Sequence, residues 1–275
     1  MTYVPFALHL VEFATGLIVI FLGRRVIDRR MRWQLRAAVG GWWLVTLWPV
    51  GDIAASHSLS VAVAQRLVIM LAVVPWIMRA ISVATMVHLT RPVLVDVLAS
   101  WLSRPLPALG VVTVGGTLTL SAPLVNAGAT NEAARWVVLL ATVLCGVVLW
   151  LPVLGSVPGA RHLSPAARSG YLFAASLLVT VMSFVWIFSL HPLYSSLTYQ
   201  QEVVHLSALA DQQIAGFVAK LGAFVPLWTV AFIIFFRADA DGVPVEESPL
   251  HWADVERHLL RSERRERRLQ RRSPR

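Results

Sequence analysis

The feature that most constrains this chain is a series of long apolar runs, each close to the ~20 residues with which an α-helix crosses a ~30 Å hydrocarbon layer. Seven such runs follow one another: Pro5–Gly23, Ala37–Ala55, Val61–Met78, Leu106–Val125, Ala133–Leu154, Gly170–Leu190 and Gln212–Phe236. Only 14% of the 275 residues are charged, against about 25% in a typical soluble protein. We therefore expect an all-α, polytopic membrane bundle with about seven transmembrane helices.

The basic residues between these runs lie in alternate connections. The first, third and fifth connections hold them: Arg24, Arg25, Arg29, Arg30, Arg32 and Arg36, then Arg79, Arg91 and Arg104, then Arg161 and Arg168. The second, fourth and sixth connections contain no Lys or Arg. Because positively charged loops stay in the cytoplasm, this alternation predicts an N-terminus outside and a C-terminus in the cytoplasm.

Two segments lie outside the seven runs. Ile81–Trp101 is apolar but contains Arg91, Pro92 and Asp96, and we interpret it as an amphipathic helix that lies in the inner membrane interface or is partly buried. Ten of the 24 basic residues lie at or beyond Arg237. The sequence thus divides into a transmembrane bundle, residues 1–236, and a basic cytoplasmic tail, residues 237–275.

The net charge of +9 raises the question of a nucleic-acid partner. No basic surface is interleaved with aromatic residues on a folded domain, so the sequence predicts no nucleic-acid binding. Basic residues beside membrane-spanning segments contact anionic lipid instead. The predicted partner of these charges is the lipid bilayer.

Polar and ionisable residues inside the apolar runs gather in the outer half of the predicted bundle. They are His9, Glu12, Asp52, Gln65, Arg66, Arg135, Asp211, Gln212, Gln213 and Lys220. A charge at the bilayer centre costs about 2.5–3.5 kcal/mol or more on insertion scales, so it persists when it is paired or faces water. We predict a polar cluster or cavity that opens to the outer face. The alternative is that these residues lie near helix ends and extend to the interface.

Metal and catalytic patterns are sparse. Imidazole suits copper and zinc, and the outer histidines besides His9 are His57, His191 and His205. None of them forms an H-x3-H pair on one helix, and the single cysteine, Cys145, excludes a thiolate cluster. No G-x-S-x-G or H-E-x-x-H pattern occurs, so we expect no enzymatic activity.

From about Leu47 to Phe236 the sequence resembles the CtaG family of cytochrome c oxidase assembly proteins. Leu209–Gly216 is similar to the family's D-Q-Q-x-x-G entry into the last helix. Trp150–Gly155 resembles its W-x-P-V segment, Arg168 and Tyr171 its R-x-x-Y element, and Leu193-Tyr194 its L-Y-P element. The resemblance implies a multi-pass protein of the plasma membrane that acts in haem–copper oxidase biogenesis and copper handling.

The sequence departs from the family where histidines are expected. The H-x-x-Q-H motif of the third helix corresponds to Ala62–Arg66, which keeps only the glutamine. The H-x3-H pair of the fifth helix falls on Arg135 and Leu139, and the Met-Trp after D-Q-Q becomes Ala219-Lys220. Because a fixed cation cannot coordinate a metal ion, we expect weak or absent copper binding. Copper remains the one cofactor that the resemblance implies.

Three hypotheses follow from the sequence. The first is a partner-binding assembly factor with a degenerate metal site, whose partners would be haem–copper oxidase subunits or a copper chaperone. The second is a transporter that uses the outer polar cavity for an ion or a small solute. The third is a membrane scaffold whose basic tail recruits a cytoplasmic partner.

Overall fold

The structure is a computed structural model that describes residues 9–27, 31–155, 163–194 and 206–240. In these residues all regular elements are helices, and an isolated β-bridge joins Ile27 to Ile81. The chain divides into two units, Met1–Ile234 and Phe235–Arg275, and the helix bundle forms the first. The predicted all-α fold is confirmed, whereas the tail beyond residue 240 lies outside the described residues.

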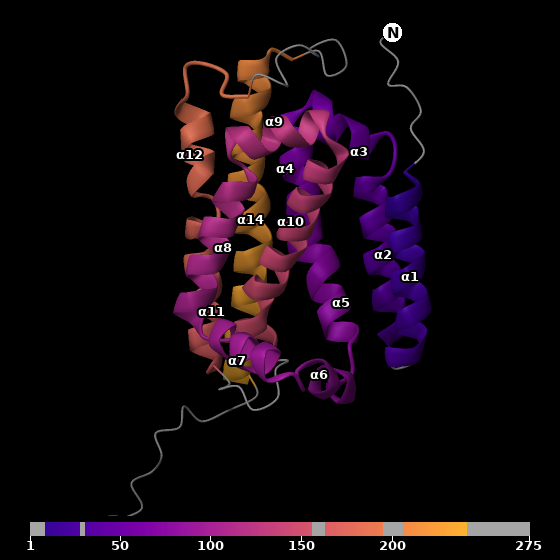
Figure 1. The fold of residues 1–275 in the computed structure, drawn as a ribbon. Helices are drawn as coiled ribbons and strands as arrows, with labels where there is room; N and C mark the ends of the chain where they lie inside the picture. Colours follow the sequence, from indigo (N-terminus) through magenta and orange to yellow (C-terminus); the bar gives the residue numbers. More distant parts are fainter. Residues whose placement is uncertain (1–8, 28–30, 156–162, 195–205, 241–275) are drawn as a thin grey trace, which may run out of the picture. The chain divides into compact units, whose positions relative to one another are not determined.

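Figure 1 shows the order of the helices along the chain. They are α1 (Leu10–Val26), α2 (Arg32–Thr46), α3 (Val50–Asp52), the π-helix η2 (Ile53–His57), α4 (Leu59–Val68), the π-helix η3 (Ile69–Val73), α5 (Val74–Ala80), α6 (Val83–Leu89), α7 (Val93–Leu102), α8 (Pro105–Thr119), α9 (Ala122–Thr130), α10 (Glu132–Leu154), α11 (Pro165–Leu178), α12 (Val181–Phe188) and α14 (Ala208–Ala240).

Four helical stretches in the described residues are long and apolar enough to cross a membrane. They are Leu59–Ala80, Glu132–Leu154, Pro165–Phe188 and Ala208–Ala238, with 22, 23, 24 and 31 residues. Helices α7 and α8 make a fifth stretch if the pair counts as one span, although the two are bent by 92°. The shortest of the four extends about 33 Å at ~1.5 Å per residue, enough for a hydrocarbon layer.

Three of the seven predicted runs are not continuous helices. The predicted Gly170–Leu190 helix has a turn at Val179-Thr180, between α11 and α12. The predicted Ala37–Ala55 helix stops at Thr46, where Leu47 turns to extended backbone shortly before Pro49. The predicted Leu106–Val125 helix stops at Thr119, and α9 starts afresh after Ser121. Proline has no N–H to donate to the carbonyl four residues earlier, and its ring clashes with that carbonyl, so it suits the first turn of a helix rather than the interior. Pro123, in the first turn of α9, therefore explains the break between α8 and α9.

The Ile81–Trp101 segment forms two short helices, α6 and α7, rather than one amphipathic helix. The break lies at Thr90–Pro92, because proline disfavours the helical conformation for the residue before it. Most apolar side chains of helix α7 are uncovered, and Leu94 is 85% exposed, whereas Leu102 is buried in the core. Figure 1 shows α6 and α7 at the end of the bundle opposite α9.

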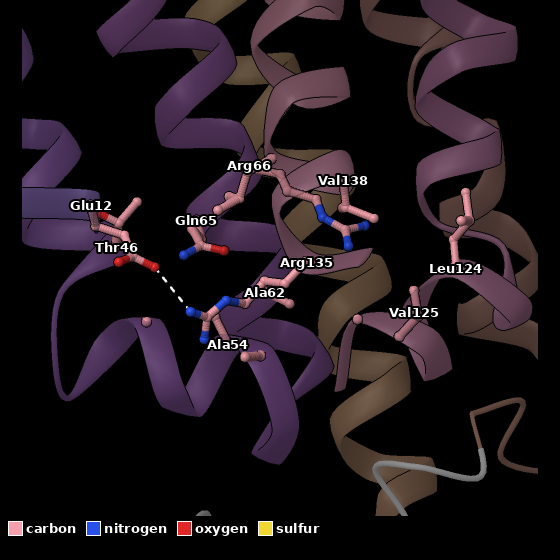
Figure 2. A pocket seen from close by; sticks show the side chains of 14 residues that line it. Glu12, Thr46, Ala54, Ala62, Gln65, Arg66, Leu124, Val125, Arg135 and Val138 are labelled. Carbon is pink, nitrogen blue, oxygen red and sulfur yellow. Dashed lines mark hydrogen bonds and ion pairs between the residues drawn. The ribbon is translucent and has the colours of Figure 1, made fainter. Parts of the chain in front are cut away.

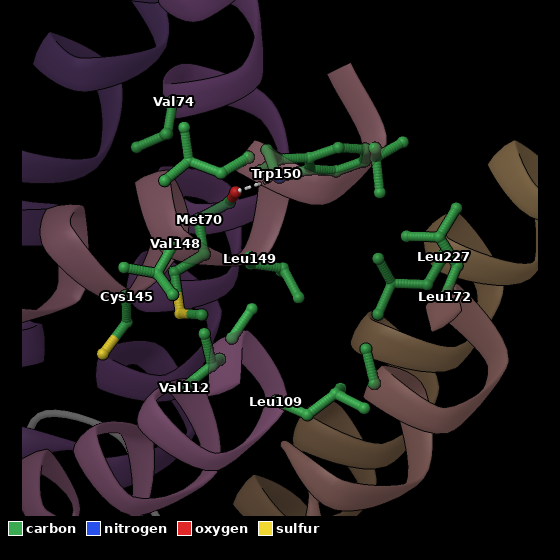
Figure 3. Close-up of a cluster of buried hydrophobic side chains, with 14 of the residues drawn as sticks. Met70, Val74, Leu109, Val112, Cys145, Val148, Leu149, Trp150, Leu172 and Leu227 are labelled. Atoms are coloured by element: carbon green, nitrogen blue, oxygen red, sulfur yellow. Dashed lines mark hydrogen bonds between the residues drawn. The ribbon is translucent and has the colours of Figure 1, made fainter. Parts of the chain in front are cut away.

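The largest hydrophobic core surrounds the second half of α10 (Figure 3). Leu149 and Trp150 of α10 are buried against Met70 of η3, Leu172 of α11 and Leu227 of α14. One side of helix α14 carries exposed apolar side chains at helical spacing, among them Phe217, Leu221 and Val225. A water-soluble protein rarely exposes so large an apolar surface, and this face is suited to lipid.

Candidate polar cavity at the α9 end of the bundle

The first turn of α1, the end of α3 and the first turn of α10 meet at the end of the bundle where α9 lies (Figure 1). His9 is buried between two carboxylates there. Its Nε2 lies 3.0 Å from Asp52 Oδ2, and its Nδ1 lies 3.4 Å from Glu12 Oε1. The three-residue spacing of His9 and Glu12 places both on one face of α1, as the sequence predicts.

Glu12 also binds the cation of α10. Arg135 Nη2 donates to Glu12 Oε1 at 3.0 Å, and Glu12 is only 3% exposed. Glu132, on the same helix as Arg135, lies farther away at 3.9 Å and is 70% exposed. The indole of Trp42 donates to the main-chain oxygen of Glu12 and attaches α2 to this point. Helices α1, α2 and α10 are thus joined around one buried carboxylate.

Two adjacent cavities share the Glu12–Arg135 pair as a common wall. The outer cavity encloses about 1060 Å³, counted with its open mouth, and is lined by His9, Asp52, Glu132 and neighbouring residues. The inner cavity spans about 600 Å³ on the same measure, open solvent included. Glu12, Ala55, Gly128 and Arg135 line both. Figure 2 shows the inner cavity with the ion pair at its edge.

The inner cavity contains a second arginine, with which no carboxylate among the described residues forms an ion pair. Arg66 of α4 lines it, and its Nη1 is buried without a hydrogen-bond partner. The neighbouring Gln65 donates to the main-chain oxygen of Val45 at 2.7 Å. Because Arg66 lies within a candidate membrane span, its charge carries the insertion cost of about 2.5–3.5 kcal/mol. An unpaired arginine at such a place is a candidate binding residue.

Asp211 does not join this cavity but caps α4. Its carboxylate accepts hydrogen bonds from Ser58 Oγ at 2.8 Å, from the Leu59 amide at 2.6 Å, and from the amide and hydroxyl of Ser60. The Leu59 and Ser60 amides are unsatisfied first-turn N–H groups of a helix, which favour an anion. Asp211 therefore joins the start of α14 to the start of α4.

The other predicted residues of α14 also lie away from both cavities. The side chain of Gln212 accepts from the Leu193 amide at 2.8 Å, and Gln213 reaches the Ser189 carbonyl at 3.5 Å. Lys220 Nζ lies 3.4 Å from Thr180 Oγ1 and 4.7 Å from the centre of the Phe184 ring. The predicted cluster is thus two groups, because its α14 members bind α4 and the segment around α12.

The donor set at the outer cavity does not fit copper. Both ring nitrogens of His9 are engaged by carboxylates, and the guanidinium of Arg135 adjoins them. His57 contacts Ser56 and Asp52, whereas His191 is exposed and His205 lies outside the described residues. Over the described ranges, no group of three His, Cys, Asp or Glu side chains is arranged to hold a metal ion.

Sequence reasoning missed three residues of the site. Asn131 lines the outer cavity and caps α10 by accepting from the amides of Ala133 and Ala134. Glu132 lines the same cavity, and Thr46 lines the inner one. Asn followed by Glu before an apolar run is a signal for a helix start, and it could have identified the first two.

The residues that carry the sequence motifs connect helices within the core. Trp150 donates to the Met70 carbonyl at 2.9 Å, and Tyr171 donates to the Leu149 carbonyl at 2.9 Å. Tyr194 donates to the Leu120 carbonyl at 2.7 Å and accepts from Trp186 at 2.8 Å. These motif residues therefore maintain the bundle. Of the residues that depart from the motifs, Ala62, Arg66, Arg135 and Leu139 line the inner cavity, whereas Ala219 and Lys220 line neither cavity.

Apolar membrane-length helices around a charged cavity at one end define an integral membrane protein of the helical-bundle class. Residues 16–239 match the cytochrome c oxidase caa3 assembly factor family (Caa3_CtaG), and the chain belongs to this family. The resemblance predicted from the motifs is confirmed, and the match extends beyond Leu47 towards the N-terminus. No curated protein and no solved structure matched the chain.

Proposed function

We propose that this protein assists the assembly of a haem–copper oxidase by binding a partner at its outer cavity, without catalysis. The observation that carries the proposal is the family match over residues 16–239. The charged, partly open cavity gives a partner polar groups to recognise, among them Asp52 and Glu132. The partner would be an oxidase subunit or a copper chaperone.

The proposal includes seven transmembrane helices in the plasma membrane. The alternating basic connections and the four long apolar helices support this topology. Helix α1, the α2–η2 segment and the α8–α9 segment would complete the seven. This topology leaves the N-terminus and the cavity outside and the basic tail in the cytoplasm.

Co-purification from native membranes tests the partner. The full-length protein carrying an affinity tag should enrich oxidase subunits or a copper chaperone over a tagged, unrelated membrane protein. A strain without the gene should lose assembled oxidase, measured by its haem spectrum and oxygen consumption. Normal oxidase in that strain, with no enrichment of these partners, would contradict the proposal.

Metal analysis tests the role of copper separately. We expect much less than one copper per chain after purification in the presence of Cu(I). The reason is that Arg66 and Arg135 stand where the family resemblance places histidine ligands, and arginine cannot coordinate a metal ion. Stoichiometric copper that disappears in His57→Ala or His191→Ala would show that the protein itself carries the metal.

Labelling of introduced cysteines tests the topology. In a Cys145→Ser background, a membrane-impermeant maleimide should label cysteines at residues 130 and 191 in intact cells. Cysteines at residues 91 and 104 should react only after permeabilisation. The reverse pattern would invert the proposed orientation.

A further inference from the structure

The inner cavity holds a fixed positive charge that the described residues do not balance. Of its two arginines, Arg135 is paired with Glu12, and Arg66 has neither an ion pair nor a hydrogen bond at its buried Nη1. Figure 2 shows the Arg66 guanidinium beside Val138, above Arg135. Arginine cannot lose its proton in a protein, so the charge persists in this apolar surrounding.

The nearest polar groups do not neutralise Arg66. The Tyr194 phenol lies close enough to be influenced by its charge, but burial raises the pKa of this phenol, so it stays neutral near pH 7. Gln65 has used its amide on the Val45 carbonyl, and Thr46 Oγ1 donates to the Trp42 carbonyl. Neither residue supplies a negative charge to Arg66.

The lining of the cavity indicates what kind of anion would fit. A guanidinium presents a planar fork that matches the two oxygens of a carboxylate. The facing walls are apolar and include Leu124, Val125 and Leu139. One cation with an apolar surround suits a monovalent group with a short hydrocarbon tail.

We propose that the inner cavity binds a small monocarboxylate, with Arg66 as its charged partner. The inner cavity adjoins the outer one at Glu12, Ala55, Gly128 and Arg135. This inference goes beyond the proposed assembly function and does not rest on it. A free short-chain acid has the required chemistry.

Calorimetric titration of the full-length protein in detergent with sodium butyrate tests the proposal. Gluconate, a bulky polar carboxylate, replaces butyrate in the reference titration at the same ionic strength. We expect saturable binding of one butyrate per chain and none of gluconate. Absence of saturable butyrate binding would overturn the proposal, as would displacement of butyrate by chloride at equal or lower concentration.

Three variants locate the site. Arg66→Gln should weaken butyrate binding at least ten-fold, whereas Arg66→Lys keeps the charge without the fork and should weaken it less. Lys220→Gln removes a cation that lines neither cavity and should leave the affinity unchanged. Wild-type affinity in Arg66→Gln would overturn the assignment.

A further variant keeps the proposal testable if Arg66→Gln does not fold. Ala62→Leu on the cavity wall retains Arg66 and reduces the space for a ligand. Butyrate binding should be lost in this variant while the gel-filtration profile stays that of the wild type. Unchanged butyrate affinity in the narrowed cavity would place the ligand elsewhere and overturn the proposal. Oxidase assembly, measured in cells that produce the same variants, tests the proposed assembly function independently.

Discussion

Arg135 in the first turn of α10 pairs with Glu12 of α1 at 3.0 Å, and this contact joins the first helix of the bundle to its most central one. The same arginine lies 3.9 Å from Glu132, one turn away on its own helix. The two carboxylates differ in burial, at 3% and 70% exposed, and therefore in what their removal should cost.

Glu12→Gln should destabilise the protein by about 1.5–3 kcal/mol, the usual range for a hydrogen bond to a charged group. The change leaves Arg135 without its buried partner and removes the carboxylate beside His9. Denaturant unfolding in detergent measures the difference. Glu132→Gln is the matched control and should stay within about 0.5 kcal/mol of wild type. Equal effects of the two variants would contradict this assignment.

Asp211→Ala should destabilise the protein by about 2 kcal/mol, because several donors at the start of α4 lose their acceptor. Hydrogen exchange should accelerate first at the amides of Leu59 and Ser60. Gln213→Ala removes only a 3.5 Å contact and serves as the control. If exchange at α4 stays as slow as in wild type, Asp211 does not serve as its cap.

Gly216→Ala should loosen the packing of α14 on α12. A Cβ at this position would lie 2.6 Å from Ile187 Cγ1 and 2.9 Å from the Ser183 carbonyl oxygen. We expect a loss of about 1–3 kcal/mol from overpacking. Gly170→Ala, where a Cβ meets no atom within 4 Å, should instead stabilise α11 by about 0.5–1 kcal/mol. Thermal unfolding of both variants should thus give shifts of opposite sign.

Lys220→Met should leave stability unchanged or raise it. The ammonium group has one long hydrogen bond to Thr180 and a contact with the Phe184 ring, and it lies within a candidate membrane span. Replacing such a charge by an apolar group of similar size removes its desolvation cost. A loss of more than about 1 kcal/mol on unfolding would assign Lys220 a stabilising role that these contacts do not explain.

The sequence predicted the fold class well because apolar run length is a direct consequence of membrane thickness. The sequence placed His9, Glu12, Asp52 and Arg135 together because each lies near the same end of its predicted helix, and therefore at a similar depth in the membrane. It did not separate Asp211 and Lys220 from that group. Depth along the membrane follows from residue count, whereas the rotation of each helix around its axis depends on packing, as at Gly216.

The positions at which helices are interrupted were also not predicted from the sequence. The stop at Thr46 and the turn at Ser121 depend on single prolines within apolar stretches. Such prolines are tolerated in continuous membrane helices when neighbours satisfy the freed carbonyls. Composition alone therefore does not distinguish Pro152, which lies inside the continuous α10, from Pro49, where the helix is broken.

The cap that Asp211 places on α4 has a consequence for biosynthesis. Ser58 and Asp211 are 153 positions apart, so the ribosome completes α4 long before it reaches the aspartate. Until then, Ser58 is the local acceptor for the first turn of α4, through the Val61 amide. A nascent chain halted before Asp211 would carry α4 without this acceptor, and the arrival of α14 completes a helix start that was made much earlier.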